Sequence, residues 1–346
     1  MATLRSQFDQ ALTNIEVNKD KAKRAIKAHT EIRAVLEKDE KLTEWGVDTK
    51  LIGSYSRDTG IYPGKDVDVF VKLTKLDTKS EPKDVYNAVW DALQKEYGDT
   101  KDGGRAEQQA RSVKVVFPDK GAYSGANSSF AVDAVPAVQD GEHWAIPTKD
   151  RNRWTASTGR WVTTDPERFG DMSSTLSTSQ LSPTVGERNA YKPIVKLMRQ
   201  VRRTHLGDKR PGGLFVEFAT YEAWDSGFVT GDEWDPLLAQ TLRRVAERLA
   251  NAAIYPLCDP ALGTPVEPAV DEKDLANAAA VFSGLADLAD EALNLDDCQA
   301  ALKWRNILGG NDRADPVFPL PPGCDASNRM APAIVPASRP EARRFG

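Results

Sequence analysis

Apolar positions change their spacing about half-way along the chain. In the first half, several short runs rich in Val, Ile and Phe have the length and composition typical of β-strands. Residues 3–38 and 84–97 instead carry apolar side chains at helical spacing. The strand-like runs cover residues 50–52, 67–73, 113–117 and 130–135. We therefore predict a mixed α/β first half that opens with one long helix or two.

Helical spacing dominates from Asn189 onward. The expected helices cover residues 190–205, 214–224, 234–253, 271–293 and 298–308. Beyond them, residues 316–346 are rich in proline and poor in large apolar side chains, which predicts a flexible tail. We expect an α+β protein with a mixed-sheet lobe over 1–170, a helical lobe over 171–315 and a tail over 316–346.

Composition and charge indicate the cellular compartment of the protein and the kinds of partner that it does not bind. A formal net charge of −5 over 346 residues gives no general attraction for DNA or RNA, so we expect no stable nucleic-acid binding. No apolar segment is long enough to span a membrane, and a charged helix replaces a secretory signal. Cys258, Cys298 and Cys324 are scattered and lack CxxC spacing, which indicates neither disulfides nor zinc. We predict a cytoplasmic protein.

A pair of acids marks the candidate chemistry. Asp66 and Asp68 stand at i and i+2 in an apolar run, so on a strand their side chains would share one face. Neighbouring carboxylates repel each other unless a cation lies between them, and oxygen-rich sites of this kind suit Mg²⁺ or Mn²⁺. Asp133, a lone acid in the apolar run 130–136, adds a third carboxylate from another strand. Two ions held by these acids could activate an attacking hydroxyl and stabilise a leaving pyrophosphate.

Gly53 and Ser54 add a phosphate-binding element. Glycine lets the backbone approach phosphate oxygens, and amides that open a following helix, with the Ser54 hydroxyl, can hold a triphosphate. Each feature by itself is weak evidence, because paired surface acids are most often simply solvated. The short spacing from Ser54 to Asp66, combined with the later Asp133, favours a nucleotide site.

These motifs resemble those of a known family. The resemblance rests on Gly-Ser-Tyr-x-Arg-x-Thr over 53–59, Asp-Val-Asp-Val over 66–69 and Val-Asp-Ala-Val-Pro over 132–136. They resemble the polymerase-β-type nucleotidyltransferases, and among these the cGAS/DncV-like CD-NTases. The resemblance implies a polymerase-β-like lobe with a mixed sheet and a helical lobe that completes the nucleotide cleft. It also implies that Asp66, Asp68 and Asp133 hold metal ions and that Gly53, Ser54 and Arg57 contact the nucleotide.

The resemblance extends to a basic helix in the second lobe. Arg199 stands where the family usually has a phosphate-contacting lysine, and Lys196, about one turn earlier, would serve as well. Both belong to a basic stripe along one helix face, for which a solvated surface is the competing interpretation. Gly-Gly-Leu-Phe at 212–215 replaces the family's Ser-Tyr pair, so the contact with the base is not predicted.

The implied activity is a condensation of nucleotides. With two Mg²⁺ ions, or Mn²⁺ in their place, NTPs (ATP, GTP or pyrimidine NTPs) would form a cyclic di- or trinucleotide second messenger and release pyrophosphate. The setting implied is bacterial antiphage (CBASS-type) signalling, in which a separate effector binds the product. For the tail that ends in Gly346, conjugation by a ligase is one interpretation and an ordinary frayed terminus is the other. Two alternatives stay open: nucleotide addition to RNA ends or a protein hydroxyl, and an inactive nucleotide or RNA sensor.

Overall fold

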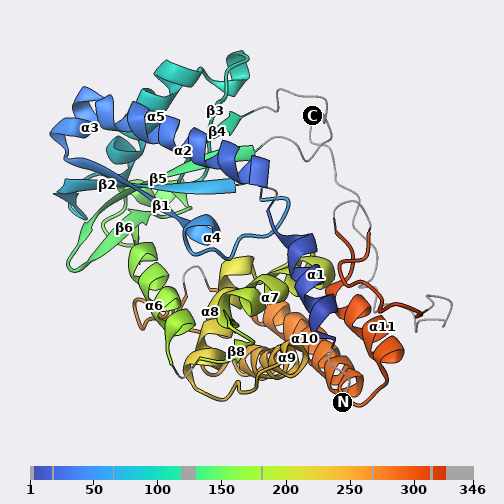
Figure 1. Cartoon of the computed structure of the whole chain (residues 1–346). Helices are drawn as coiled ribbons and strands as arrows, with labels where there is room; N and C mark the ends of the chain where they lie inside the picture. The colour runs from blue at the N-terminus through green and yellow to red at the C-terminus, as the bar shows by residue number, and fades with distance from the viewer. Residues whose placement is uncertain are drawn as a thin grey trace. The chain divides into compact units, whose positions relative to one another are not determined.

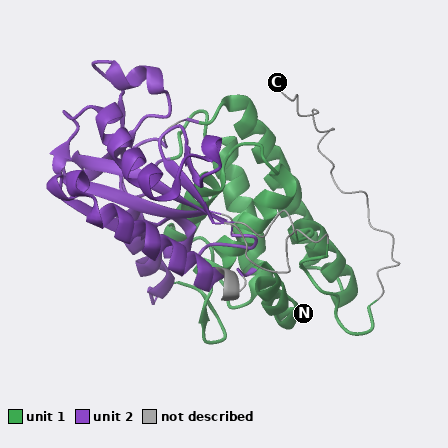
Figure 2. Cartoon of the chain, turned by 90° about the horizontal axis from the view of Figure 1, so that it is seen from above, with its two compact units in different colours: residues 1–15, 181–257, 270–346 green, residues 16–180, 258–269 purple. Residues whose placement is uncertain are grey.

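The chain folds into two compact units (Figure 2). A computed structural model describes residues 4–17, 19–64, 66–117, 130–180, 182–266, 269–311 and 315–324. Unit 1 comprises Met1–Ile15, Leu181–Leu257 and Val270–Gly346. Unit 2 comprises Glu16–Gln180 and Cys258–Ala269. Each unit is therefore built from segments that are distant in sequence.

Unit 2 is built on a mixed sheet (Figure 1). Its strands are β1 (Val47–Ile52), β2 (Asp66–Asp77), β3 (Ala106–Gln108), β4 (Val113–Phe117), β5 (Phe130–Asp140), β6 (His143–Pro147) and β7 (Trp161–Thr164). The order is β1-β2-β5-β4-β3, and β6 joins β5 to β7. Strands β2 and β5 run parallel, whereas the other pairs are antiparallel, which confirms the predicted mixed sheet.

Helices cover one face of this sheet. The helices of unit 2 are α2 (Lys19–Lys38), α3 (Glu40–Glu44), α4 (Gly53–Ser56), α5 (Pro82–Tyr97) and α6 (Pro166–Thr178), with short 3-10 turns η1 (Thr100–Asp102) and η2 (Arg151–Thr155). Helices α2 and α5 lie along the sheet (Figure 1) and form one core with the buried Val67, Val69 and Val71 of β2. Because strand residues alternate between faces, Asp66 and Asp68 are left on the other face. A smaller hydrophobic cluster around Phe70 lies on the same face as these two acids.

Unit 1 is helical, as predicted. Its helices are α1 (Arg5–Ile15), α7 (Tyr191–Leu206), α8 (Gly213–Asp225), α9 (Trp234–Ala250), α10 (Glu272–Ala292) and α11 (Asp297–Leu308), and a small hairpin pairs β8 (Thr184–Val185) with β9 (Arg188–Asn189). The apolar stripe of α1 anchors it in this unit. Phe8 is fully buried, with its ring centroid 5.1 Å from that of Trp304 and 4.9 Å from that of Phe318.

The division of the chain differs from the sequence prediction in two places. The helical region expected over 3–38 is two helices, and α1 groups with unit 1 whereas α2 groups with unit 2. Residues 258–269 return to unit 2 although they follow β8, β9, α7, α8 and α9 of unit 1 in the region expected to be the second lobe. A boundary at 170 therefore does not separate the two units.

The expected tail and the free cysteines also need correction. Val317 and Phe318 are fully buried, so the segment that begins at 316 first packs against unit 1. Cys298 and Cys324 form a disulfide, with their Cα atoms 5.3 Å apart, although their spacing gave no sequence signal for one. Residues 325–346, including Gly346, lie outside the described residues.

Candidate functional site

Strand pairing brings two of the predicted acids side by side. In the parallel β2–β5 register, Asp68 lies directly opposite Asp133, while Asp66 lies opposite Ala131. All three acids lie on the sheet face that α2 and α5 do not cover, because their neighbours Val67, Val69 and Val132 belong to the core on the other face. The predicted carboxylates of unit 2 are therefore grouped at the start of two adjacent strands.

The environments of the three carboxylates differ. The Asp66 side chain is 56% exposed, whereas one carboxylate oxygen of Asp133, Oδ1, is buried and has no hydrogen-bond partner. Burial raises the pKa of Asp133 to about 7, and repulsion by Asp68 and Asp66 adds to the rise. A buried carboxylate oxygen without a partner, beside two further acids, is an arrangement that a cation would stabilise.

Gly53 fits tightly against the acid pair. It begins the short helix α4 directly after β1, with a left-handed φ of 76°. A Cβ atom placed on it would lie 2.2 Å from Oδ2 of Asp68. Only glycine satisfies both the backbone angle and this close approach without moving the carboxylate.

The Gly-Ser segment continues into a loop that closes on itself. The Ser54 carbonyl accepts hydrogen bonds from the Thr59 and Gly60 amides at 2.9 and 3.1 Å. The Tyr55 hydroxyl donates to the Gly64 carbonyl at 3.1 Å. These bonds fix the backbone that carries Ser54 next to the start of β2.

Arg57 has a packing role within unit 2. Only 4% of the residue is exposed, and its guanidinium lies 4.9 Å from the centre of the Phe169 ring in α6. Its charge also acts on Asp259, where it opposes a pKa rise caused mainly by burial. The structure thus places Arg57 among buried groups, and its predicted contact with the nucleotide stays a prediction.

The two candidate cations of unit 1 are on α7. Lys196 is only 6% exposed, so this part of the basic stripe is not an ordinary solvated surface. Arg199 donates from Nη1 to Oε2 of Glu217 in α8 at 3.1 Å, and the Glu217 side chain is fully buried. Gly213, in the segment that replaces the family's Ser-Tyr pair, begins α8 beside the Arg199 guanidinium.

The donor set fits divalent cations, although it does not form a ready-made cage. Carboxylate oxygens are the ligands that Mg²⁺ prefers, and the unpartnered Oδ1 of Asp133 is available to one. Within the described ranges, no three His, Cys, Asp or Glu side chains converge closely enough to hold an ion as they stand. An ion that binds here would therefore bring the carboxylates closer together, and its positive charge would offset the repulsion between them.

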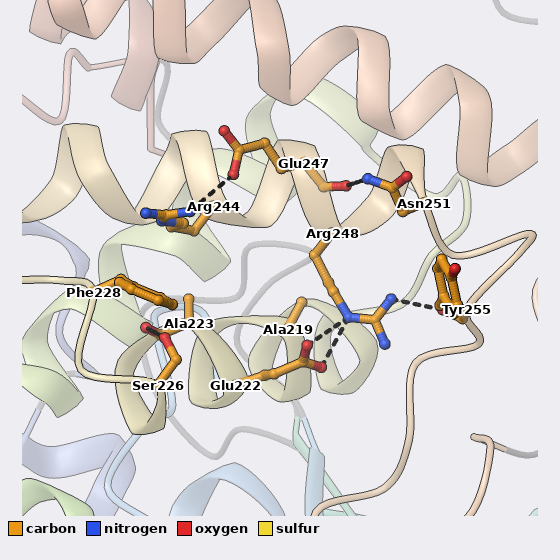
Figure 3. Close-up of a pocket in the computed structure, with 10 residues that line it drawn as sticks. All are labelled: Ala219, Glu222, Ala223, Ser226, Phe228, Arg244, Glu247, Arg248, Asn251 and Tyr255. Atoms are coloured by element: carbon orange, nitrogen blue, oxygen red, sulfur yellow. Dashed lines mark hydrogen bonds and ion pairs between the residues drawn. The ribbon is translucent and has the colours of Figure 1, made fainter.

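A pocket of about 450 Å³ lies elsewhere, between α8 and α9 (Figure 3). Its walls include Arg248, which pairs with Glu222, and Arg244, which lies over the Phe228 ring. None of the predicted site residues lines this pocket. The arginines are engaged with groups of the pocket itself, so we assign the chemistry to the carboxylates instead.

Two charged residues beside the candidates were not predicted. Lys114 on β4 lies directly opposite Asp133, and Glu217 is the partner of Arg199. Lys114 is a lone charge in the apolar run 113–117, the signal that marked Asp133 in its own strand. Glu217 gave no comparable signal, because its position between apolar residues is common in helices.

Comparison with known proteins decides the family. Residues 1–175, just over half of the chain, match the Second Messenger Oligonucleotide or Dinucleotide Synthetase (SMODS) domain. The chain belongs to the SMODS family. This match confirms the CD-NTase resemblance, and the protein is a nucleotidyltransferase of the cyclic oligonucleotide synthase type. Such nucleotidyltransferases typically use divalent metal ions.

Individual relatives agree with this assignment of the SMODS protein. A cyclic AMP-AMP-AMP synthase from Acinetobacter sp. is 28% identical over 89% of this chain and 84% of its own length. The CD-NTase CdnG of Bradyrhizobium diazoefficiens, solved with GTP, matches 88% of this chain and 95% of its own with a TM-score of 0.64 at 15% identity. Escherichia coli CdnC, solved in complex with HORMA-deltaN, covers 88% of this chain and 96% of its own with a TM-score of 0.62 at 14% identity.

Among the helices in the described part of the chain, none has both the length and the apolar character needed to cross a bilayer.

Proposed function

We propose that this SMODS protein condenses ATP into a cyclic oligonucleotide, and that the product is a cyclic trinucleotide of AMP. The observation that carries the chemistry is the Asp68–Asp133 pair on adjacent parallel strands, with an unpartnered carboxylate oxygen on Asp133 and Gly53 packed against Asp68. Support for the product comes from the Acinetobacter cyclic AMP-AMP-AMP synthase, which aligns with nearly the whole chain.

The residues act mainly by binding and orientation. Two Mg²⁺ ions bound to Asp66, Asp68 and Asp133, or Mn²⁺ in their place, would neutralise phosphate charge and polarise the attacking hydroxyl. Gly53 and Ser54 would hold the triphosphate, and Lys196 and Arg199 would contribute positive charge from α7. The ribose hydroxyl oxygen of one nucleotide bonds to the α-phosphorus of the next, and the bond to pyrophosphate breaks. Repetition and a final ring closure complete the product.

The fixed strand register supports this division of roles. Asp68 and Asp133 are held by backbone hydrogen bonds of the central strands, so their separation is set by the sheet rather than by side-chain freedom. Gly53, which has no Cβ, leaves room for the Asp68 carboxylate in its present position. The sheet thus fixes the backbone positions of these two acids, and an ion would complete the arrangement of their carboxylates.

The biological part of the proposal is second-messenger signalling in the cytoplasm. A separate effector would bind the product, as the family description suggests, and antiphage defence is the setting proposed from the CD-NTase likeness. The complex of E. coli CdnC with HORMA-deltaN supports a search for a HORMA-type partner of this protein as well.

Product analysis tests the proposal. Purified protein is incubated with Mg²⁺ and each radiolabelled NTP, alone and in mixtures, and the products are treated with phosphatase and separated. We expect a phosphatase-resistant product from ATP alone that co-migrates with cyclic tri-AMP, and none from the Asp68→Asn or Asp133→Asn variant. A different protected product would overturn the choice of ATP or of ring size, and labelled RNA or protein would favour the alternative transferase activities.

A further inference from the structure

Lys114 is a fourth charged side chain on the acidic face of the unit 2 sheet. Its neighbours in β4, Val113 and Val115, belong to the core on the other face, so strand alternation turns Lys114 toward the face that carries Asp133. The register places it directly opposite Asp133 on β5 and opposite Glu107 on β3. A row of charges, Asp68–Asp133–Lys114–Glu107, therefore crosses four neighbouring strands.

The Lys114 side chain also lies near a second carboxylate, that of Asp66 on β2. Its Nζ lies 3.9 Å from Oδ1 of Asp66, and 28% of its side chain is exposed. One ammonium group thus lies beside two of the three carboxylates proposed to hold metal ions. Its single positive charge only partly offsets their negative charge.

We propose that Lys114 is a positioning residue that serves as an internal counter-ion of the metal site. It stabilises the grouped carboxylates while no divalent ion is bound, and it competes with the ion for Asp66 during loading. The inference rests on the proposed function, because it assumes that the acids bind divalent ions. It adds a residue that sets how tightly they bind them.

The two states of the site respond to Lys114 in opposite directions. Without the lysine and without metal, the acids repel each other more strongly, so the folded protein loses stability. Without the lysine but with metal present, no ammonium group competes for the carboxylates, so the ion binds more tightly. A partly exposed pair at this distance corresponds to about a two- to fivefold change in binding. An ordinary surface ion pair would instead contribute equally with and without metal.

Mn²⁺ binding to the full chain tests the role of Lys114. The Mn²⁺ dissociation constant is measured by titration calorimetry, and Tm is measured in chelator and in saturating Mn²⁺, for the wild type and for Lys114→Met. Lys114→Arg keeps the charge. Lys79→Met is the matched control, because Lys79 lies 4.0 Å from Oδ2 of Asp77 beyond the far end of β2 and is 93% exposed.

For Lys114→Met we expect a dissociation constant about two- to fivefold lower than that of the wild type, and a lower Tm in chelator that Mn²⁺ restores. Lys114→Arg and Lys79→Met should resemble the wild type. Should Lys114→Met not fold, Lys114→Gln is measured in the same way. Unchanged or weaker Mn²⁺ binding by the neutral variant, or an equal loss of Tm with and without Mn²⁺, overturns the role of Lys114 alone. Absence of Mn²⁺ binding in the wild type overturns the metal-dependent function as well.

Discussion

At the residue scale, both the backbone angle of Gly53 and the nearby Asp68 side chain require glycine at this position. Gly53→Ala should cost about 1–2 kcal/mol of stability because of the left-handed backbone, and its methyl group should also displace the Asp68 carboxylate. We expect product formation to fall at least about tenfold, since a misplaced ligand costs transition-state stabilisation. Rates of product formation and Tm values check this.

Gly103→Ala separates the two effects of the Gly53 substitution. Gly103 has a similar φ of 81°, but no atom lies within 4 Å of the position where its Cβ would stand. This variant should show the same loss of stability and keep its activity. Equal losses of activity in the two variants would show that the contact with Asp68 does not matter.

The raised pKa of Asp133 predicts how stability depends on pH. Its folded pKa of about 7 exceeds the ordinary value of 3.8, so the folded state binds this proton more tightly than the unfolded state does. The resulting stability is fully present below about pH 4 and is lost as the pH rises through 7. In chelator, the free energy of unfolding should therefore fall over this range by more in the wild type than in Asp133→Asn.

Denaturant titrations at several pH values measure this difference. Saturating Mg²⁺ should reverse the wild-type loss near pH 8, because the ion binds the deprotonated carboxylate. If the wild type and Asp133→Asn show the same pH dependence in chelator, the proposed environment of Asp133 is wrong.

How far the sequence predicts the site differs from residue to residue. The alternation of Val and Asp in 66–69 correctly indicated that the acids share a face, because strand geometry alone determines that. Strand order did not follow from the sequence, so the register that places Lys114 beside Asp133 could not be predicted. Arg57 matched a motif, but whether an arginine packs or stays exposed depends on partners such as Phe169 that lie far away in sequence.

At the element scale, the Arg199–Glu217 pair joins α7 to α8. Arg199→Ala should lower the free energy of unfolding by about 3 kcal/mol, because it leaves the buried Glu217 carboxylate without its guanidinium. Arg199→Met combined with Glu217→Leu should recover most of this loss. Denaturant unfolding measures all three proteins.

An exposed arginine provides the control for this pair. Arg243→Ala removes ion pairs from Arg243 to Asp287 and Asp290, which are largely exposed, and should cost at most about 1 kcal/mol. A loss for Arg199→Ala no larger than this would contradict a structural role. Because Arg199 variants are expected to lose stability, their nucleotide binding is compared under conditions in which each variant is folded.

Long elements were predicted better than short ones. Helices α7 to α11 and strand β4 follow strong apolar periodicity and lie close to their predicted ranges. Strands β2 and β5 begin near the predicted residues but continue to Asp77 and Asp140, beyond the predicted ends at 73 and 135. Strands β6 and β7 were missed, since His143–Pro147 and Trp161–Thr164 are short and become strands only by pairing beyond β5. Ile26, an apolar residue in the first helical region, is 58% exposed, so apolar spacing alone did not identify the buried face of α2.

At the scale of the whole molecule, the chain crosses between its two units more than once. Periodicity identifies helices, but it cannot tell which unit a helix joins, so the placement of α1 with unit 1 was not predicted. The Cys298–Cys324 disulfide and the buried Phe318 likewise depend on contacts that form only in the folded chain. Short sequence motifs identify the residues that carry the proposed chemistry. The packing that supports these residues depends on contacts between segments that are distant in sequence.

We propose that carboxylates on the face of the unit 2 sheet that α2 and α5 leave uncovered carry out metal-dependent nucleotidyl transfer. Replacing both Asp66 and Asp68 with Ala removes groups that repel each other and Asp133, so the fold should remain intact. Asp77→Ala is the control, because Asp77 ends the same strand and its side chain is 52% exposed.

The decisive measurement is the release of pyrophosphate and of phosphatase-resistant product from labelled ATP with Mg²⁺, together with the Tm of each protein. We expect no product from the double variant, a Tm at least equal to that of the wild type in chelator, and wild-type turnover by Asp77→Ala. Product formation by a folded Asp66→Ala/Asp68→Ala variant would contradict the proposal.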